Sequence, residues 1–160
     1  MDYQLEELNH NNYHRVRQID RSDIPEDYVD SVDTIMDITD YGVEHHCVGH
    51  TFAVKTNEQY IGVLLIGEAL AWDTDPPEMK ETPFYRLMGF VIDKQYRNMG
   101  IGSRVLEQAI EIIYREFGIR PIALGCHENN DSAKRFYLKH GFCKTAYREG
   151  SDFYFIRYPY

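Results

Sequence analysis

The segment FVIDKQYRNMGIGSRVLEQAIEIIYREF, residues 90–117, joins an apolar run to a long amphipathic pattern through a loop with two glycines. Residues 84–92 are apolar on both faces, which predicts a central buried strand. Residues 103–117 place their apolar side chains on one helical stripe, and Gly118 follows as a C-cap. The loop RNMGIG, residues 97–102, therefore opens a helix directly after a strand, where backbone N–H groups and the helix dipole favour a phosphate.

Two common nucleotide-binding loops do not fit residues 97–102. A dinucleotide fingerprint needs a third glycine at position 105, where the chain has Val105. A nucleoside-triphosphate loop needs Gly-Lys-Ser/Thr, which does not occur here. A glycine-containing strand–helix turn with no ligand is the simpler interpretation of this loop taken alone.

A second motif lies downstream. Residues 121–126 predict another buried strand, and residues 131–140 predict a helix that Gly141 closes. The pattern Asn130-x-x-Ala133-x-x-x-Tyr137-x-x-x-Gly141-Phe142 follows that strand. Together with Arg97-x-x-Gly100-x-Gly102, it resembles the GNAT superfamily of acetyl-CoA-dependent N-acetyltransferases. The resemblance covers residues 84–142 by motif and residues 50–70 by pattern.

This resemblance implies a co-substrate site for acetyl-CoA. The loop from Arg97 would bind the pyrophosphate, and the strand at Phe90 would pair with the pantetheine arm. The strands at 84–92 and 121–126 would splay apart to admit the thioester. The implied coenzyme A contacts are Phe90, Val91, Ile92, Arg97, Asn98, Met99, Gly100, Ile101, Gly102, Ser103, Asn130 and Tyr137.

The chemistry predicts direct attack of an amine on the thioester within a ternary complex, and a backbone N–H of the strand at 84–92 can stabilise the oxyanion. The coenzyme A thiolate then needs a proton, and Tyr137 is the expected general acid. The general base stays open, because residues 84–90 contain no carboxylate. Glu68, Glu128 and His127 are candidates, and a water chain or an amine that arrives neutral remains a further alternative.

Acidic residues predict the class of acceptor. Residues 22–44 carry eight acids and no Lys or Arg, and in the resembled family this region walls the acceptor site. We expect Asp30, Asp33, Asp37, Trp72 and Asp73 to bind a small cationic amine such as a polyamine. The segments FVIDKQYRNMGIG and HENNDSAKRFYLKHGF also resemble bacterial spermine/spermidine acetyltransferases of the BltD type. The alternatives are a peptide, protein or antibiotic amine, or a non-catalytic acetyl-CoA sensor.

The remaining patterning predicts one mixed α/β (α+β) domain over residues 1–160. Further strands are expected at residues 3–8, 50–56, 60–70, 142–147 and 152–158, with one or two acidic helices in 22–44. This order predicts a mostly antiparallel sheet of about seven strands with helices on both faces. The C-terminal edge strands can also pair between chains, which is compatible with a homodimer.

Composition narrows the partners and the compartment. The net charge of −9, with no strong basic stripe, disfavours nucleic acid. The longest apolar run spans residues 60–67, too short for a membrane span, and the first 15 residues lack signal-peptide character. Three cysteines without a CxxC pair favour a reducing cytoplasm. His45, His46 and His50 lack a recognisable ligand spacing, so no metal is expected.

Overall fold

The computed structural model describes residues 2–68 and 71–159. Its seven strands are β1 (Gln4–Glu7), β2 (Gly49–Thr56), β3 (Gln59–Gly67), β4 (Tyr85–Ile92), β5 (Ile122–His127), β6 (Phe142–Glu149) and β7 (Asp152–Arg157). Its helices are α1 (Tyr13–Val16), α2 (Val32–Glu44), α3 (Pro77–Glu81), the 3₁₀ turn η1 (Lys94–Tyr96), α4 (Ile101–Phe117) and α5 (Asp131–Lys139). The strands form one sheet in the order β1-β2-β3-β4-β5-β7-β6.

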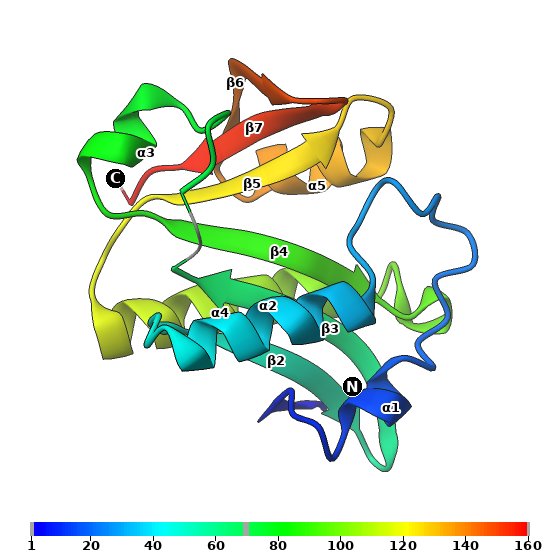
Figure 1. The fold of residues 1–160 in the computed structure, drawn as a ribbon. Helices are drawn as coiled ribbons and strands as arrows, with labels where there is room; N and C mark the ends of the chain where they lie inside the picture. Colours follow the sequence, from blue (N-terminus) through cyan, green and yellow to red (C-terminus); the bar gives the residue numbers. More distant parts are fainter. Residues whose placement is uncertain (1, 69–70, 160) are drawn as a thin grey trace.

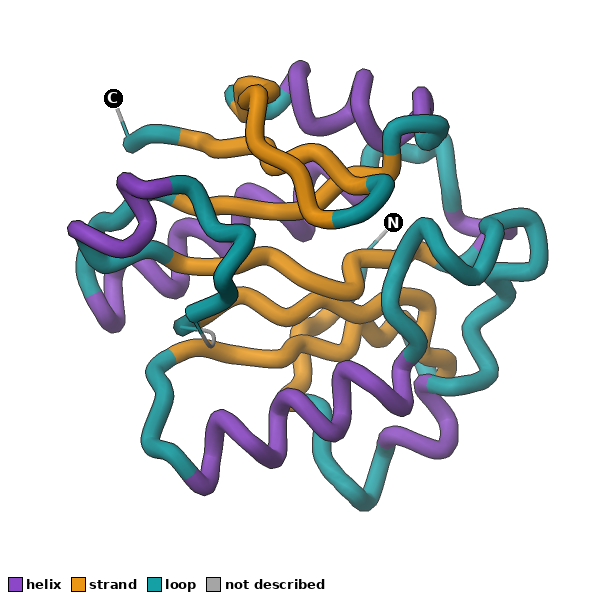
Figure 2. The backbone as a smooth tube through the Cα atoms, turned by 45° about the horizontal axis from the view of Figure 1, so that its top comes forward, coloured by secondary structure: helices purple, strands orange, loops and turns teal. Residues whose placement is uncertain are grey.

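The sheet is mixed and mostly antiparallel, which confirms the predicted fold class. Only β4 and β5 run parallel, because α4 crosses over between them. Helices cover both faces of the sheet (Figures 1 and 2). On one face α4 buries Leu106 and Ile113 against the strands, and on the other face α2 buries Ile35 and Met36. Among the described residues, no helix combines the length and apolarity that a membrane crossing requires.

Several expected boundaries differ in the structure. Residues 22–31 form a loop rather than a first acidic helix, and the helix begins at Val32 with Ser31 as its N-cap. The apolar spacing in 22–31 is interrupted by Pro25, whose ring restricts the preceding residue to extended backbone. A short helix that the patterning did not predict, α3, lies between β3 and β4. The strand expected at 60–70 ends at Gly67, and residues 69–70 lie outside the described residues.

The parallel strands β4 and β5 pair over a very short length. Their register holds only at Tyr85 with Ile122 and at Arg86 with Ala123. Beyond these two pairs the strands diverge, and the loop of residues 17–31 lies beside their open end (Figure 1). This leaves the β5-facing edge of the second half of β4 without a strand partner.

A bulge in β4 lies within this unpaired half. Val63 of β3 pairs with Val91, whereas Leu65 pairs with Met88, so β4 carries one extra residue opposite Leu64. Gly89 in the bulge has φ +64°, a conformation that favours glycine. A side chain there would also collide with Ile35 of α2. The bulge therefore depends on glycine both for its backbone angle and for the close approach of α2.

Candidate active site

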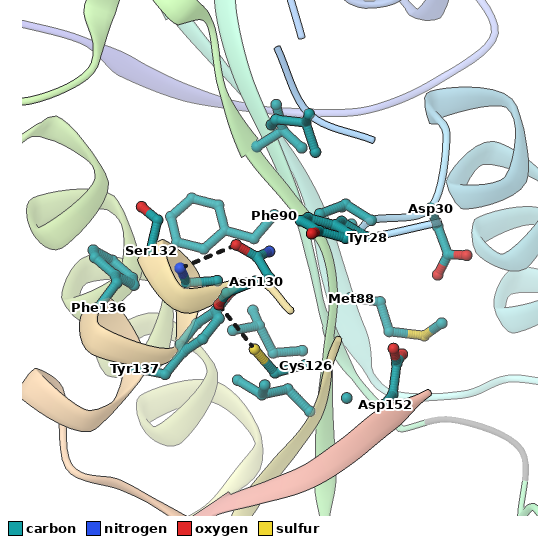
Figure 3. Close-up of a pocket in the computed structure, with 18 of the residues that line it drawn as sticks. Tyr28, Asp30, Met88, Phe90, Cys126, Asn130, Ser132, Phe136, Tyr137 and Asp152 are labelled. Carbon is teal, nitrogen blue, oxygen red and sulfur yellow. Dashed lines mark hydrogen bonds between the residues drawn. The ribbon is translucent and has the colours of Figure 1, made fainter. Parts of the chain in front are cut away.

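A cavity of about 1200 Å³ lies where β4 and β5 separate. Its lining comes from β4, β5, α5, the start of α4, the loop of residues 23–30 and the ends of the β6–β7 hairpin (Figure 3). This volume exceeds the roughly 300–1,000 Å³ of an ordinary small-molecule site. The cavity can therefore hold a long ligand together with a second, smaller one.

One mouth of the cavity is the turn before α4. Asn98 and Gly100 both have positive φ angles, +63° and +80°, which bend the backbone around the start of the helix. Gly100 is the N-cap of α4 and offers no side-chain hydrogen bond, whereas Ser31 caps α2 and Asn130 caps α5. The first amide groups of α4 are thus left for an anionic ligand.

Arg97 supports the same interpretation of this mouth. Its Nε donates to the backbone oxygen of Ile92 at 2.8 Å, and its guanidinium pairs with Asp23. These contacts hold the side chain against the end of β4. The remaining Nη2 atom is buried and has no hydrogen-bond partner. An unsatisfied guanidinium nitrogen beside uncapped helix amides fits a pyrophosphate.

The structure brings most of the expected coenzyme A residues to the cavity. Those that line it are Phe90, Val91, Ile92, Arg97, Asn98, Gly100, Gly102, Ser103, Asn130 and Tyr137. Met99 is instead exposed, and the side chain of Ile101 lies in the core, so only their backbone can serve a ligand at this mouth. Asn130 also has a structural role, because its Oδ1 accepts the Ala133 N–H at 3.2 Å and caps α5.

Tyr137 lies on α5 and lines the inner part of the cavity (Figure 3). Its ring packs edge-on against Phe136 and Phe142, with ring centroids 5.3 and 5.4 Å away. Among the described residues its hydroxyl has no hydrogen-bond partner. Burial, and to a smaller extent the nearby Cys126, raises the pKa of Tyr137, so the phenol keeps its proton at neutral pH.

None of the three expected base candidates lines the cavity. Glu68 accepts the Val48 N–H at 2.9 Å and pairs with Arg120 at 3.0 Å, and the Val48 hydrogen bond is the main reason that its pKa is lowered. Glu128 pairs with Arg148 at 2.6 Å on the surface. Both carboxylates are committed to structural contacts away from the strand separation.

His127 is likewise held in place outside the cavity. Its Nδ1 accepts the Asn129 N–H at 3.1 Å, and its Nε2 lies 3.2 Å from Asp27. Its ring stacks on Tyr28 at 4.6 Å. Nδ1 accepts the backbone proton, and Nε2 faces the Asp27 carboxylate. The ring therefore positions the loop of residues 23–30.

The expected acidic wall is only partly assembled. Asp30 and Trp72 line the cavity, whereas Asp33, Asp37 and Asp73 are exposed and do not. The helical period of α2 explains this difference, because it turns Asp33 and Asp37 away from the buried Ile35 and Met36. Asp33 pairs instead with Arg17 at 3.1 Å.

The sequence analysis missed two carboxylates of the cavity, Glu149 and Asp152. They stand on either side of the β6–β7 turn and join Asp30, which comes from more than a hundred residues earlier in the chain. Burial raises the pKa of Asp30, and Glu149 adds to this rise while Arg21 opposes it. No local pattern could have found this group, because the turn at Glu149–Asp152 is an ordinary polar hairpin in sequence.

A buried ion pair lies at the end of the cavity that also contains these carboxylates. Arg86 of β4 pairs with Asp75, and both side chains are almost fully buried. The Trp72 ring lies 4.1 Å from the Arg86 guanidinium, and Tyr154 donates to Asp75 at 3.0 Å. The ion pair connects the loop before α3 to the short segment in which β4 and β5 are still paired.

Within the described residues, no group of three His, Cys, Asp or Glu side chains could hold a metal ion.

Comparisons with known proteins agree with this geometry. Residues 13–142 match the sequence model described as the acetyltransferase (GNAT) family. The chain is 26% identical over 125 residues to N-alpha-acetyltransferase 30 of Schizosaccharomyces pombe, covering 72% of this chain and 75% of that protein.

Two solved structures share the fold over nearly their whole length. The PaiA N-acetyltransferase of Thermoplasma acidophilum, in complex with coenzyme A, has a TM-score of 0.72 and 16% identity, with 99% of both chains covered. Arabidopsis thaliana Naa50, in complex with the bisubstrate analogue CoA-Ac-MVNAL, has a TM-score of 0.65 and 18% identity, with 98% of this chain and 97% of that chain covered.

Proposed function

We propose a function from one established premise: the chain belongs to the acetyltransferase (GNAT) family. It is an acetyl-CoA-dependent N-acetyltransferase that moves an acetyl group to an amine. Our proposal concerns the residues that do this and the kind of amine that accepts the group. The observation that carries it is one cavity with an anion-binding mouth at α4 and three carboxylates, Asp30, Glu149 and Asp152, at the acceptor end.

Acetyl-CoA would enter through the mouth at α4. The pyrophosphate would bind the uncapped amides from Gly100 onward and the free Nη2 of Arg97. The pantetheine arm would lie along Phe90–Ile92, where β4 has an edge that no strand pairs. This places the thioester at the bulge of Gly89, close to the inner wall that Tyr137 lines.

The amine would attack the thioester carbonyl directly in a ternary complex. A backbone N–H of the bulged segment of β4 would stabilise the oxyanion, because the bulge removes it from the β3–β4 ladder. When the C–S bond breaks, Tyr137 would donate its proton to the thiolate. The raised pKa of Tyr137 suits a proton donor, since the group stays protonated until a strong base forms beside it.

The acceptor would be a cationic amine with an apolar body. The carboxylates of Asp30, Glu149 and Asp152 attract an ammonium group, and Tyr28, Met88 and Trp72 supply apolar contact area. A polyamine such as spermidine has this chemistry and is the first candidate. A peptide α-amine is the second candidate, favoured by the relative that is named as an N-alpha-acetyltransferase and by the neighbour solved with CoA-Ac-MVNAL.

The test is coenzyme A release from acetyl-CoA, followed with a thiol dye over a panel of amines. The panel contains spermidine, spermine, putrescine, an aminoglycoside and the pentapeptide MVNAL with a free N-terminus. Turnover of polyamines supports the first candidate, and turnover of the peptide alone replaces it with the second. No turnover of any amine would contradict the proposed function.

A charge variant then tests the acceptor end directly. Asp30→Asn should raise the KM of spermidine about five- to tenfold, because it removes one carboxylate from a partly buried group. Asp40→Asn is the matched control, since Asp40 does not line the cavity and its carboxylate pairs with His10 at 2.9 Å. An unchanged spermidine KM in Asp30→Asn would contradict the carboxylate assignment while leaving acetyl transfer intact.

A further inference from the structure

Asp152 occupies a space that the sheet leaves open for it. It begins β7 and pairs with His127 of β5. Its side chain leans over the neighbouring position Gly125, where a Cβ atom would lie only 3.1 Å from the Asp152 Oδ2. The missing side chain at Gly125 thus leaves room for the Asp152 carboxylate, which lines the cavity (Figure 3).

Asp152 and Tyr137 line the same cavity from opposite faces of the sheet. Leu124 and Cys126 of β5 face the α4 side, and Tyr137 packs against that same core. Gly125 alternates to the other face, and Asp152 lies over it. Both side chains reach one cavity because β4 and β5 have separated there. A thioester in the gap would therefore have Tyr137 on one side and Asp152 on the other.

No Lys or Arg side chain of the described residues pairs with the Asp152 carboxylate. Within the described residues it takes part in no hydrogen bond or ion pair. The titratable groups that face it are Glu149 of β6, Asp30 and Asp27 of the loop after α1, and Cys126 and His127 of β5. Burial raises the pKa of Asp152 most, the three carboxylates raise it further, and His127 opposes them. A cationic ligand would stabilise the Asp152 carboxylate in this setting, and so would a proton taken from that ligand.

We propose that Asp152 is the general base of the reaction and takes the proton of the acceptor ammonium. The inference rests on the proposed function. One N–H bond of the ammonium breaks and its proton moves to an Asp152 carboxylate oxygen, which leaves a neutral amine. The nitrogen lone pair forms the C–N bond on the α2 side of the gap. The C–S bond then breaks toward the α4 side, where Tyr137 protonates the sulfur.

The proton balance follows from this division. Of the two protons that the nitrogen loses, the first leaves through Asp152 to solvent. The second, released when the amide forms, replaces the proton that Tyr137 has given to the sulfur. The proposal also explains why β4 needs no carboxylate of its own and why Glu68, Glu128 and His127 can serve in structural contacts.

The first test compares Asp152→Asn with Asp40→Asn over pH 6–10, with spermidine and MVNAL as acceptors. We expect kcat of Asp152→Asn at pH 7 to fall about 100-fold or more, with the KM of acetyl-CoA unchanged. The loss should shrink as the pH rises, since more amine then arrives neutral. It should also shrink for 2,2,2-trifluoroethylamine, a weakly basic amine. An equal loss at every pH and with every amine would overturn the proposal.

A second variant disturbs the carboxylate without removing it. Gly125→Ala would place a methyl group 3.1 Å from the Asp152 Oδ2 and displace the carboxylate by a few tenths of an ångström. We expect kcat to fall several-fold while coenzyme A binding stays unchanged. A wild-type kcat in Gly125→Ala would contradict a base held over Gly125.

A third measurement does not depend on turnover. Carbon-13 NMR of the aspartate carboxyls, with Asp152→Asn for assignment, gives the pKa of Asp152 in the complex with coenzyme A. We expect a pKa above the ordinary value of about 3.9 and a shift of this resonance when spermidine is added. A pKa at or below that value would overturn the proposal even in an enzyme for which no acceptor had been found, so its failure is distinguishable from that of the proposed function.

Discussion

Tyr137 is the residue on which the proposed acid step depends. Replacing it with phenylalanine removes only the hydroxyl, and the ring contacts with Phe136 and Phe142 stay in place. We expect kcat to fall about 100-fold or more, because the thiolate must then take its proton from solvent. A positioned general acid typically contributes a rate factor of about this size. The KM of acetyl-CoA should change by less than about threefold, since the hydroxyl forms no hydrogen bond with the residues that the structure describes.

The measurement is steady-state thiol release at saturating acceptor. Tyr147→Phe is the control, because Tyr147 is an exposed tyrosine on β6 that does not line the cavity. Equal kcat values for Tyr137→Phe and the wild type would remove Tyr137 from the mechanism.

The two ends of helix α4 provide a matched test of the anion-binding mouth. Gly100 precedes the helix at φ +80°, and Gly118 follows it at φ +106°. Within the described part of the chain, an added Cβ at either glycine would meet no atom of a more distant residue within 4 Å. Alanine at either position should cost about 1 kcal/mol of stability through backbone strain alone. Only Gly100→Ala should also weaken coenzyme A binding, by about tenfold, because only that end lines the cavity.

Chemical denaturation and calorimetric titration with coenzyme A measure the two effects separately. If Gly118→Ala weakened coenzyme A binding as much as Gly100→Ala, strain in α4 rather than the mouth would explain the result.

His50 joins three elements on the α4 side of the sheet. It lies on β2 between Glu7 of β1 and Glu116 of α4, and the Glu7 contact is the main reason that its pKa rises to about 9. Because the folded pKa lies above the ordinary value near 6.5, protonated His50 stabilises the fold fully below about pH 6.5. This stabilisation is lost as the pH rises through about 9.

We expect His50→Gln to lower the free energy of unfolding by about 1–2 kcal/mol at pH 6, since both carboxylates are partly exposed and screened. The difference between His50→Gln and the wild type should shrink by pH 9.5. Urea denaturation at the two pH values checks this, and a difference independent of pH would show that packing rather than charge makes the contribution.

Coenzyme A should stabilise the whole molecule, because it binds the folded chain and not the unfolded one. Coenzyme A at about 100 times its Kd contributes about 2.7 kcal/mol. For a chain of this size that corresponds to a rise in Tm of roughly 5–10 °C. Differential scanning fluorimetry measures the shift, with ATP at the same concentration as control. An equal shift with ATP would mean that the cavity recognises a nucleotide rather than the pantetheine arm.

The coenzyme A side could be predicted largely from the sequence because its signals are local. A buried strand, a glycine turn and a helix follow one another within residues 84–117. A second strand, turn and helix follow one another within residues 122–139. Even there, the sequence pattern did not show that the side chains of Met99 and Ile101 lie outside the cavity. Met99 points to solvent and Ile101 points into the core, because α4 begins at Ile101.

The acceptor side could not be predicted in the same way. The acidic stretch predicted a carboxylate wall, but of its three candidates Asp30 alone lines the cavity, because α2 turns Asp33 and Asp37 to solvent. Glu149 and Asp152 reach the site through the strand order β5-β7-β6, which inserts the last strand beside β5. That order depends on long-range pairing, which no window of neighbouring residues encodes.

Local patterning thus predicted the fold class, most of the element order and the glycine turn that opens α4, since each follows from contacts between residues near in the chain. The separation of β4 and β5 and the acidic end of the cavity came from the folded chain. Gly125 illustrates the difference: in sequence it is one glycine in a strand, and in the sheet it is the space that Asp152 fills from a neighbouring strand. Asp30, Glu149 and Asp152 become neighbours only when the strands pair into one sheet and the loop of residues 23–30 packs beside it. The grouping of these carboxylates is therefore a property of the tertiary structure.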